Sequence, residues 1–352
     1  VRRPARSGRR AATVTGLEIS ATQIVAAEAR VQDGRIVAER VAARPLSPGL
    51  MRDGLVVEPV QLATELRGLF AEHRFSKRVR VGLATPRTVL RVIDLPPLEE
   101  RDIHAALMMQ AQERIPMPLD RAVLDHQTVG LVETSEGHRL RVIVVATERE
   151  GIEPLLESLR RAGLRAEGID LSIFAVIRAL SGGVDAERGP VLYAQLGDLV
   201  NIAIAEGGVC RFTRQAPQGL AMVLERLAES RAIPVDEALK LVQGAGSRPP
   251  GEAWDDDERE VAELLARAAA ELGSELRAAA EFYSLQFGGT VTSGVVAGPL
   301  ATLPGFVIAL GAESGLKLVC GEVTPGGPDA LGGVDSRLAA LASGLAVGEL
   351  PR

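Results

Sequence analysis

Two short segments place acidic and hydroxyl side chains at a turn between apolar strands. The first segment contains Glu18, Ser20 and Thr22, and the second contains Gly197 and Asp198. A tight turn of this kind can present its backbone N–H groups to the oxygens of a phosphate. Phosphate binding at such a turn, as in an enzyme that hydrolyses ATP, is therefore one open interpretation.

Other chemistries lack the residue patterns that they need. No G-x-x-x-x-G-K-[ST] motif is present, because none of the three lysines, Lys77, Lys240 and Lys317, follows a glycine. G-x-S-x-G, H-E-x-x-H and C-x-x-C motifs are also missing from the sequence. We therefore predict no catalytic residue and no metal site. Cys210 and Cys320 fall in separate apolar segments, which predicts two buried thiols.

Composition and charge exclude several classes of function. The 352 residues include 46% hydrophobic and 24% charged residues, which is typical of soluble proteins. With a net charge of −6 and 3% aromatic residues, the chain offers little to nucleic acid. No apolar stretch reaches the roughly 18–20 residues that span a bilayer, so we expect a cytoplasmic protein. Five arginines lie within residues 1–10, which predicts a basic disordered tail over residues 1–12.

The elements that carry the two candidate turns repeat along the chain. Alternating apolar residues predict a three-strand meander followed by a helix, and the same order returns about 180 residues later. The predicted strands are 14–19, 23–31 and 35–43, then 191–196, 199–205 and 209–215, and the predicted helices are 59–74 and 219–231. The repeat indicates an internally duplicated protein.

A segment that does not repeat separates the two meanders. Its predicted strands are 79–84, 89–95, 123–130 and 140–147, and its predicted helices are 99–115 and 151–162. Pro116 and Pro118 end the first of these helices, since proline cannot continue a helix. We predict a compact α+β module over residues 81–167, inserted into a first domain that comprises residues 13–80 and 168–190.

Residues 191–352 are predicted to form the second domain. Apolar residues at helical spacing from Val261 to Tyr283 predict one long helix, the main part of a helical subdomain at about 217–290. A strand at 291–297 follows. The chain is then predicted to close with a helix after Gly305, a strand near 316–320 and a small-residue helix at 336–347.

A set of short motifs follows in order along the chain after the basic tail. These are Gly16-Leu17-Glu18-Ile19, Leu46-Ser47-Pro48-Gly49-Leu50, Asp53-Gly54, Asp94-Leu95-Pro96, Ile115-Pro116-Met117-Pro118-Leu119-Asp120, Val123-Leu124-Asp125, Arg161-Ala162-Gly163-Leu164, Glu281-Phe282-Tyr283 and Leu303-Pro304-Gly305. Together they resemble the PilM family of type IV pilus assembly proteins, within the actin/Hsp70/FtsA class. The resemblance implies an α/β fold of duplicated actin-like (ribonuclease H-like) domains with an inserted FtsA-type α+β subdomain.

The resemblance also implies a role and a partner. The chain is similar to cytoplasmic adaptors that bind the N-terminal tail of an inner-membrane protein, PilN, beside other pilus assembly proteins. It is therefore expected at the inner membrane through a PilN-like partner. We predict a groove for that tail at Leu95, Ile115, Pro116 and Met117. An FtsA-like polymerising tether is a further alternative, although the helix at 336–347 is not basic and amphipathic.

A site for ATP and Mg²⁺ is the last implication of the resemblance, with Glu18, Ser20, Thr22, Gly197 and Asp198 around the phosphates. A slow ATPase or an ATP-gated switch built on these residues is an open alternative. Here, however, the sequence departs from the family. In the first phosphate motif Ser20 stands in place of glycine and Val25 in place of lysine. Ser20 puts a Cβ where the backbone would approach a phosphate. Glu18 keeps an acidic group for a hydrated Mg²⁺, on a longer side chain than the family's aspartate.

The remaining nucleotide motifs are altered as well. The second phosphate motif reads Gln195-Leu196-Gly197-Asp198, and the Gly-Gly of the adenosine motif becomes Gly298-Pro299. Glu237 and Lys240 match the helix that lines the base and ribose in nucleotide-binding relatives. Because phosphoryl transfer depends on metal positioning and charge stabilisation, these changes favour a binding scaffold over an enzyme.

Overall fold

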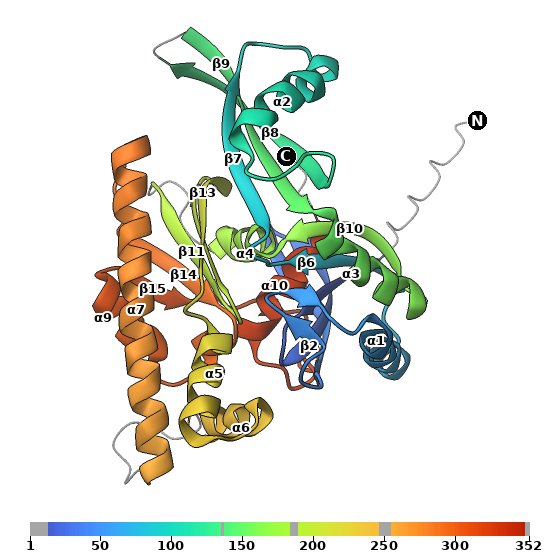
Figure 1. The fold of residues 1–352 in the computed structure, drawn as a ribbon, viewed down its shortest axis with the longest axis vertical. Helices are drawn as coiled ribbons and strands as arrows, with labels where there is room; N and C mark the ends of the chain where they lie inside the picture. The colour runs from blue at the N-terminus through green and yellow to red at the C-terminus, as the bar shows by residue number, and fades with distance from the viewer. Residues whose placement is uncertain (1–12, 135–136, 184–188, 246–254, 349–352) are drawn as a thin grey trace, which may run out of the picture.

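The computed structural model describes residues 13–134, 137–183, 189–245 and 255–348. Two large sheets lie side by side, and a smaller sheet projects from one end of the molecule (Figure 1). The basic tail predicted over residues 1–12 lies outside the described residues. None of the described helices combines the length and the apolar character that crossing a membrane requires.

The first large sheet has six strands in the order β10-β6-β1-β2-β3-β16. Its strands are β1 (Thr15–Ile19), β2 (Gln23–Gln32), β3 (Arg35–Pro45), β6 (Arg78–Leu83), β10 (Arg165–Leu171) and β16 (Thr324–Pro325). β1, β2 and β3 form the predicted antiparallel meander, and β6 pairs with β1 in parallel. The helices α1 (Pro59–His73) and α3 (Arg149–Arg161) pack on one face through Leu62, Leu66, Leu155 and Leu159.

The second large sheet repeats this plan in the order β13-β12-β11-β14-β15. Its strands are β11 (Val191–Leu196), β12 (Val200–Glu206), β13 (Val209–Ala216), β14 (Ser293–Ala297) and β15 (Lys317–Cys320). β11 to β13 form the second antiparallel meander, and β14 pairs with β11 in parallel as β6 does with β1. Cys210 is buried as predicted, but Cys320 is exposed, because β15 is an edge strand with a free side.

Matching turns at the far end of both meanders strengthen the duplication. Asp33 and Gly34 have φ angles of 50° and 73° between β2 and β3, and Gly207 and Gly208 have 55° and 76° between β12 and β13. Two consecutive positive φ angles define a type I′ turn, which matches the twist of a two-residue hairpin. The sequence places Gly or Asp at all four positions, which are residues that tolerate this backbone.

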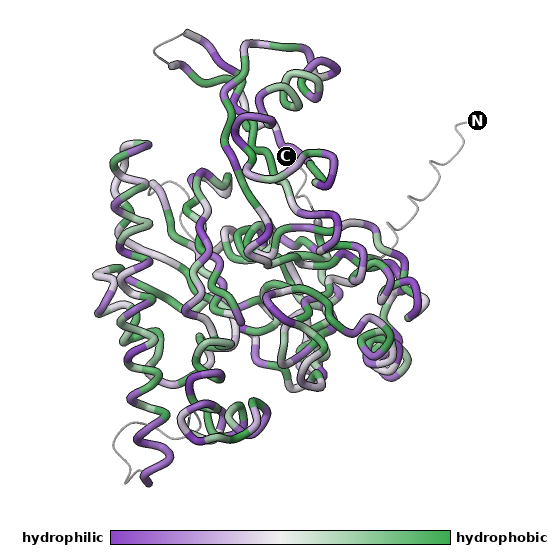
Figure 2. The backbone as a smooth tube through the Cα atoms, in the orientation of Figure 1, coloured by the Kyte–Doolittle hydropathy of each residue, from purple (hydrophilic) through white to green (hydrophobic). Residues whose placement is uncertain are grey.

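Helices cover the second sheet and share one hydrophobic core with it. The covering helices are α5 (Leu220–Arg231), α6 (Val235–Ala245), α7 (Asp256–Phe287), α8 (Pro299–Thr302) and α9 (Phe306–Ser314). The predicted long helix is α7, which begins with a capping box between Asp255 and Glu258. Its apolar side buries Leu264, Leu272 and Leu276 in that core. Apolar segments accordingly concentrate in the two sheets and on the inward sides of the helices (Figure 2).

The inserted module is smaller than predicted. A three-stranded antiparallel sheet, β7-β9-β8, comprises β7 (Thr88–Leu95), β8 (Ala122–Thr134) and β9 (Gly137–Glu148), and α2 (Glu100–Arg114) covers one face. The predicted limits of 81 and 167 are wrong, since they fall inside β6 and β10 of the first large sheet. The predicted helix at 151–162 is α3, whose apolar residues pack in the first core. A two-stranded hairpin, β4 (Met51–Arg52) and β5 (Leu55–Val56), lies beside α3.

The C-terminal segment returns to the first sheet, so the prediction that residues 191–352 all belong to the second domain is wrong. β16 pairs with β3, and α10 (Ser336–Val347) packs against β1 and β2. On one side α10 buries Ala339 and Ala342 against the first sheet, and on the other it buries Ala340 and Leu341 beside β11 and β14. The helix α4 (Ser172–Leu180), followed by a 3-10 turn at Ser181–Gly183, lies next to it.

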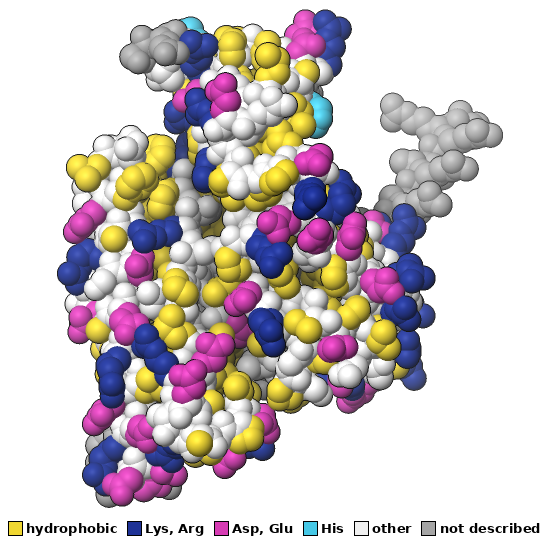
Figure 3. Space-filling view, in the orientation of Figure 1, with side chains coloured by type: hydrophobic (Ala, Val, Ile, Leu, Met, Phe, Trp, Pro, Cys, Tyr) yellow, Lys and Arg dark blue, Asp and Glu magenta, His cyan; other side chains and the backbone are white. Residues whose placement is uncertain are grey.

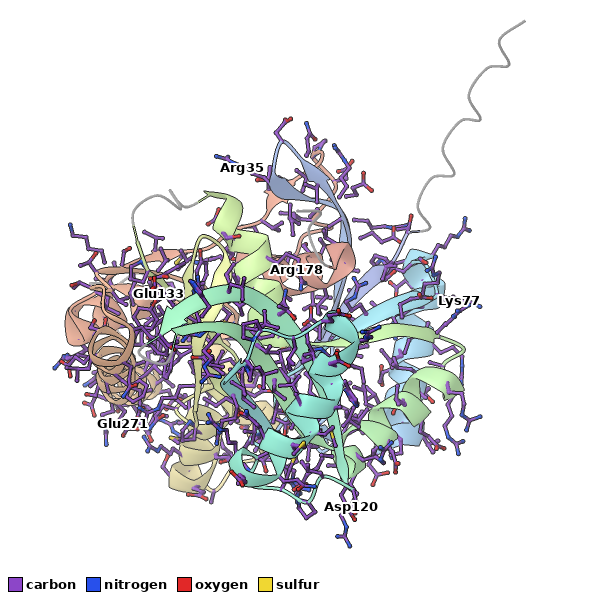
Figure 4. The ribbon with its side chains drawn as sticks, turned by 90° about the horizontal axis from the view of Figure 1, so that it is seen from above. Arg35, Lys77, Asp120, Glu133, Arg178 and Glu271 are labelled. Carbon is purple, nitrogen blue, oxygen red and sulfur yellow. The ribbon has the colours of Figure 1, made fainter. Side chains whose placement is uncertain are left out.

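Close backbone approach explains the small residues of α10. A Cβ added to Gly16 of β1 would lie 1.8 Å from the Ala342 carbonyl oxygen, and one added to Gly344 would lie 2.0 Å from that of Ala175 in α4. Arg178 of α4 donates to the Gly344 carbonyl at 2.8 Å and lies beside α10 in the interior (Figure 4). The helix is therefore held tightly between the two sheets.

Candidate functional site

The β1–β2 turn and the β11–β12 turn meet where the two large sheets face each other. The Ala21 N–H donates to Asp198 Oδ2 at 2.6 Å, and Gln195 Nε2 donates to Glu18 Oε1 at 3.2 Å. Both hydrogen bonds join the first sheet to the second. Glu18 and Asp198, which lie 180 positions apart, therefore come together at one site.

Ser20 closes the first turn on itself. Its Oγ accepts from the Thr22 N–H at 3.3 Å and from the Gln23 N–H at 3.1 Å. The Ser20 N–H donates to the Gln23 carbonyl at 2.9 Å, and the Ala21 N–H is taken by Asp198. Each backbone N–H of residues 20–23 thus has an acceptor within the protein.

Both carboxyl groups of the site hold protons more tightly than usual. Burial raises the pKa of Glu18 from 4.5 to about 8, with a further contribution from the charge of Asp198, and the hydrogen bond from Gln195 acts in the opposite direction. Burial also raises the pKa of Asp198, while the Ala21 N–H opposes the shift. Asp198 Oδ1 is buried and has no hydrogen-bond partner among the described residues.

A chain of hydrogen-bonded amide side chains leads to Glu18. Asn201 Nδ2 donates to Gln195 Oε1 at 2.7 Å, and Gln215 Nε2 donates to Asn201 Oδ1 at 2.9 Å. Gln195 and Asn201 are buried, so these hydrogen bonds fix the orientation of the Gln195 amide toward Glu18. Neither residue was among the predicted site residues. The sequence feature that could have identified them is a polar amide within each of two mainly apolar strands, β11 and β12.

A small pocket opens beside the two carboxylates. Apolar side chains such as Met51, Val56, Val81 and Leu155 form most of its wall, with Ser20, Gly197 and Pro299 also at its surface. The described side chains that line it include no lysine or arginine. Its interior has about 40 Å³ of space, enough for about three water molecules at roughly 10–15 Å³ each. It is therefore a narrow, acidic pocket.

Four other predicted nucleotide residues lie away from this pocket. Thr22 remains in the first turn, where its Oγ1 lies 3.4 Å from Ser20 Oγ, and Gly298 packs against the backbone of Leu196. Glu237 and Lys240 are exposed on α6 and do not line the pocket. Lys240 Nζ lies 3.7 Å from Asp236 Oδ2 on the same helix.

The predicted partner groove is only partly at the surface. Leu95 and Ile115 are buried in the core under α2, with exposed fractions of 0% and 5%, so neither side chain can contact a peptide. The family resemblance across this segment, which marked them as candidates, does not distinguish a groove residue from a core residue. Pro116 is exposed and Met117 is half-buried, so these two can contribute to a docking surface.

Groups of three or more histidine, cysteine, aspartate or glutamate side chains that could hold a metal ion do not occur within the described ranges. Glu18 and Asp198 supply carboxylate oxygens, the donors that Mg²⁺ prefers, but no third acidic ligand accompanies them there.

Solved structures share the fold of this chain. A structure described as "PilM-PilN type IV pilus biogenesis complex" is 24% identical, covers 95% of this chain and 97% of its own, and has a TM-score of 0.80. The ethanolamine utilization protein EutJ from Carboxydothermus hydrogenoformans is 17% identical with a TM-score of 0.56, covering 96% and 90%. MreB 5 of Spiroplasma citri bound to AMPPNP is 10% identical with a TM-score of 0.50, covering 94% of each chain.

These similarities confirm the predicted fold class of duplicated actin-like domains. The family described as "Type IV pilus assembly protein PilM" matches residues 16–238, which is well over half of the chain. The match runs from the first candidate turn, through the inserted module, to α6. This chain therefore belongs to the PilM family of type IV pilus assembly proteins.

Proposed function

We propose that this chain is a scaffold of type IV pilus assembly that binds the cytoplasmic tail of a PilN-like inner-membrane protein and does not turn over ATP. Through that partner it would lie at the cytoplasmic face of the inner membrane. The observation that carries the proposal is the closed β1–β2 turn, in which each N–H of residues 20–23 is already bonded. The relative solved as a PilM-PilN complex supports the choice of partner.

The residues at the site do not fit the phosphates of ATP. Phosphate oxygens need N–H donors or cations, and the turn has no donor to spare while the pocket has no cation. The two carboxyl groups, Glu18 and Asp198, offer no positive charge to a polyanion. We therefore propose no reaction of ATP at this site.

A second surface fits the tail of a partner. On the first domain, Val57 and Val60 expose 45% and 55% of their surface, at the start of α1. At the base of the inserted module, Val123 exposes 37% and Met117 is half-buried. We call these four residues the docking surface. Singly exposed apolar residues are ordinary, but a group on both sides of a module boundary is typical of a peptide site.

Two contacts bring the sides of this surface together. The Arg149 N–H donates to the Arg121 carbonyl at 2.8 Å, which ties the first residue of α3 to the base of the inserted module. Leu55 of β5 approaches Gly151 closely, since a Cβ added to Gly151 would lie 3.0 Å from Leu55 Cδ2. The start of α3 therefore lies between the β5–α1 corner and residues 117–123.

A free strand edge adds a second mode of recognition. β8 pairs with β9 on one side only, so its other side presents unpaired backbone groups. An extended tail can gain main-chain hydrogen bonds from such an edge and specificity from apolar contacts with alternate side chains. Val123, at the start of β8, belongs to both features. The chemistry expected of the tail is thus a short extended segment with apolar residues.

Calorimetric titration with the cytoplasmic N-terminal peptide of the PilN-like partner tests the proposal. We expect a Kd in the micromolar range, about −8 kcal/mol. Val60→Glu should weaken binding at least ten-fold, because burying a valine contributes roughly 1.5–3 kcal/mol. Leu285→Glu, a matched change at an exposed leucine of α7, should have no effect. Equal binding by both variants would place the tail elsewhere.

One observation favours a second candidate, an ATP-gated switch. The unpartnered Asp198 Oδ1 lies in the wall of the pocket beside Glu18, and a bound cation would relieve the repulsion between the two carboxylates. Ligand at 100-fold above its Kd stabilises a protein by about 2.7 kcal/mol, which would raise the Tm of a chain of this size by roughly 4 °C. We expect no shift in the Tm with millimolar Mg-ATP. A clear magnesium-dependent shift would favour the ATP-gated switch over the scaffold.

A further inference from the structure

The side of α7 that points away from the hydrophobic core is exposed along its C-terminal half. Six exposed residues lie there at helical spacing, which places them on one side of the helix. They are Ser274, Arg277, Ala278, Glu281, Phe282 and Leu285. We call these six residues the outer face of α7.

The upper part of this face is apolar and already ordered. Leu285 exposes 87% of its surface and Phe282 exposes 47%. The Phe282 ring lies against Phe212 of β13, with 5.3 Å between the ring centroids, and the buried Tyr283 donates to Glu206 at 2.8 Å. Hydrophobic side chains gather accordingly at the upper end of α7 in Figure 3. Because these contacts fix the end of the helix, covering it costs little conformational entropy.

The lower part of this face carries two opposite charges. Arg277 and Glu281 lie four positions apart, and neither has an ion-pair partner within the described ranges. Two neighbouring carboxylates are already paired: Glu271 with Arg226 at 3.0 Å, and Glu275 with Arg214 at 2.8 Å. Glu313 of α9 lies beside Gly273, at the margin of the face. The outer face itself therefore presents one cation and one anion that a second molecule can pair.

We propose that the outer face of α7 binds the same face of a second copy of this chain, as an antiparallel pair of helices. With a two-fold axis between Ala278 and Glu281, Arg277 of each copy stands opposite Glu281 of the partner copy, so two ion pairs form. A parallel pair would instead set Arg277 beside Arg277 and Glu281 beside Glu281, and like charges repel. The charges of this face are therefore complementary to themselves in the antiparallel arrangement.

The same axis brings the apolar residues together. Phe282 lies opposite Ala278 of the partner copy, and Leu285 lies opposite Ser274 of the partner copy, so each large side chain meets a small one. Since the axis repeats every contact, dimerisation covers two leucines and two phenylalanines. The helices touch along residues 274–285, which is about 18 Å at about 1.5 Å per residue. This is a small interface, so we expect a weak dimer.

A contact of this kind closes at two copies. Both copies use the same surface, which leaves none free for a third, so no filament can grow through α7. The helices α7 and α1, the second of which carries part of the docking surface, lie on opposite sides of the molecule (Figure 1). The dimer therefore keeps both docking surfaces open, and on the proposed function it would hold two partner tails. Self-association itself does not depend on the tail.

Sedimentation equilibrium of the full chain, without the partner's tail, tests the proposal. Between about 5 and about 500 µM we expect a monomer–dimer equilibrium whose Kd falls inside this range. Leu285→Glu should raise this Kd at least ten-fold, because it places an unpaired charge in the apolar part of the contact, once from each copy.

Exchange of charges tests the antiparallel register. Arg277→Glu alone and Glu281→Arg alone should each weaken dimerisation by on the order of ten-fold, since each sets like charges opposite one another. The double variant Arg277→Glu, Glu281→Arg should dimerise like the wild type. An equimolar mixture of the two single variants should form a heterodimer, because each then carries the charges that the other needs.

The matched control makes the same change of charge elsewhere on α7. Arg267→Glu alters a side chain that is 68% exposed and lies outside residues 274–285, so it should leave the Kd unchanged. Circular dichroism melting checks that every variant folds. A wild type that stays monomeric up to about 500 µM would mean that something other than a second copy covers this face. That result would overturn the proposal, as would a double variant that fails to dimerise or equal losses in Arg267→Glu and Arg277→Glu.

Discussion

Replacing Glu18 with glutamine should change how stability depends on pH. Because the pKa of Glu18 rises from 4.5 to about 8 on folding, the folded protein holds one proton that the unfolded chain releases between these values. The free energy of unfolding must therefore fall as pH rises through this window, by at most about 1.4 kcal/mol per pH unit. Glutamine keeps the acceptor for Gln195 but cannot ionise, so the variant loses this dependence.

The size of the effect follows from the same shift. A difference of about 3.5 pH units corresponds to about 4.8 kcal/mol as an upper limit. Glu18 keeps part of its surface in contact with solvent, and it shares its titration with Asp198, so we expect about 2 kcal/mol. Glu18→Gln should already be more stable than the wild type at pH 5.5, which lies above the unfolded pKa of 4.5, and the difference should grow to that amount by pH 8.5.

Urea unfolding at several pH values between 5.5 and 8.5 measures the difference between wild type and variant. Other titrating groups are common to both proteins and cancel in the comparison. Glu237→Gln, the same substitution at an exposed carboxylate on α6, serves as the control. A difference for Glu18→Gln that is constant with pH, or that favours the wild type at pH 8.5, would refute the assignment of a protonated carboxyl to this site.

Three further predictions concern packing, helix capping and thiol chemistry. Gly344→Ala should destabilise the protein by about 3 kcal/mol in urea unfolding, because its Cβ would overlap the Ala175 carbonyl. The control, Gly244→Ala on α6, has open space around it and should stabilise the protein by about 0.5–1 kcal/mol. Similar effects of the two substitutions would contradict the packing of α10. Asp255→Ala removes the capping box of α7 and should lower the free energy of unfolding by about 1 kcal/mol, measured by urea unfolding. An unchanged free energy of unfolding would mean that the cap does not stabilise the protein. A thiol reagent should react rapidly with Cys320 alone, since Cys210 is buried and its pKa is raised to about 12. Rapid addition of two reagent molecules per protein, measured by mass spectrometry, would contradict the burial of Cys210.

The meanders could be predicted from the sequence because their signal is local. Alternating apolar residues and the turn residues Asp33-Gly34 and Gly207-Gly208 report on short segments that fold largely by their own preferences. The limits of the inserted module could not be predicted in this way. Val79 and Val81 alternate with Arg80, and this short alternating pattern does not say which of two sheets the strand joins.

The same limitation applies to the site and to the C-terminus. The residue types marked Glu18 and Asp198 as candidates, but their contact depends on how two distant turns meet. Leu95 was chosen because it lies in a segment that resembles the family, and such a resemblance marks core residues as well as groove residues. The alanines of α10 predicted a helix and gave no sign of its neighbours, because small residues fit any close packing.

The position of α10 has a consequence for how the protein is made. The first sheet needs β16 and α10 to cover its strands, yet about 160 residues separate β10 and α4 from the end of α10. At roughly 5–20 residues per second, a ribosome adds that length in roughly 10–30 s. During this time Val25, Ala27 and Ile36 lack the neighbours that bury them in the finished protein. The first domain can therefore complete its core only after residues 336–347 have been synthesised, so we expect its folding to finish after the strands of the second sheet have been made.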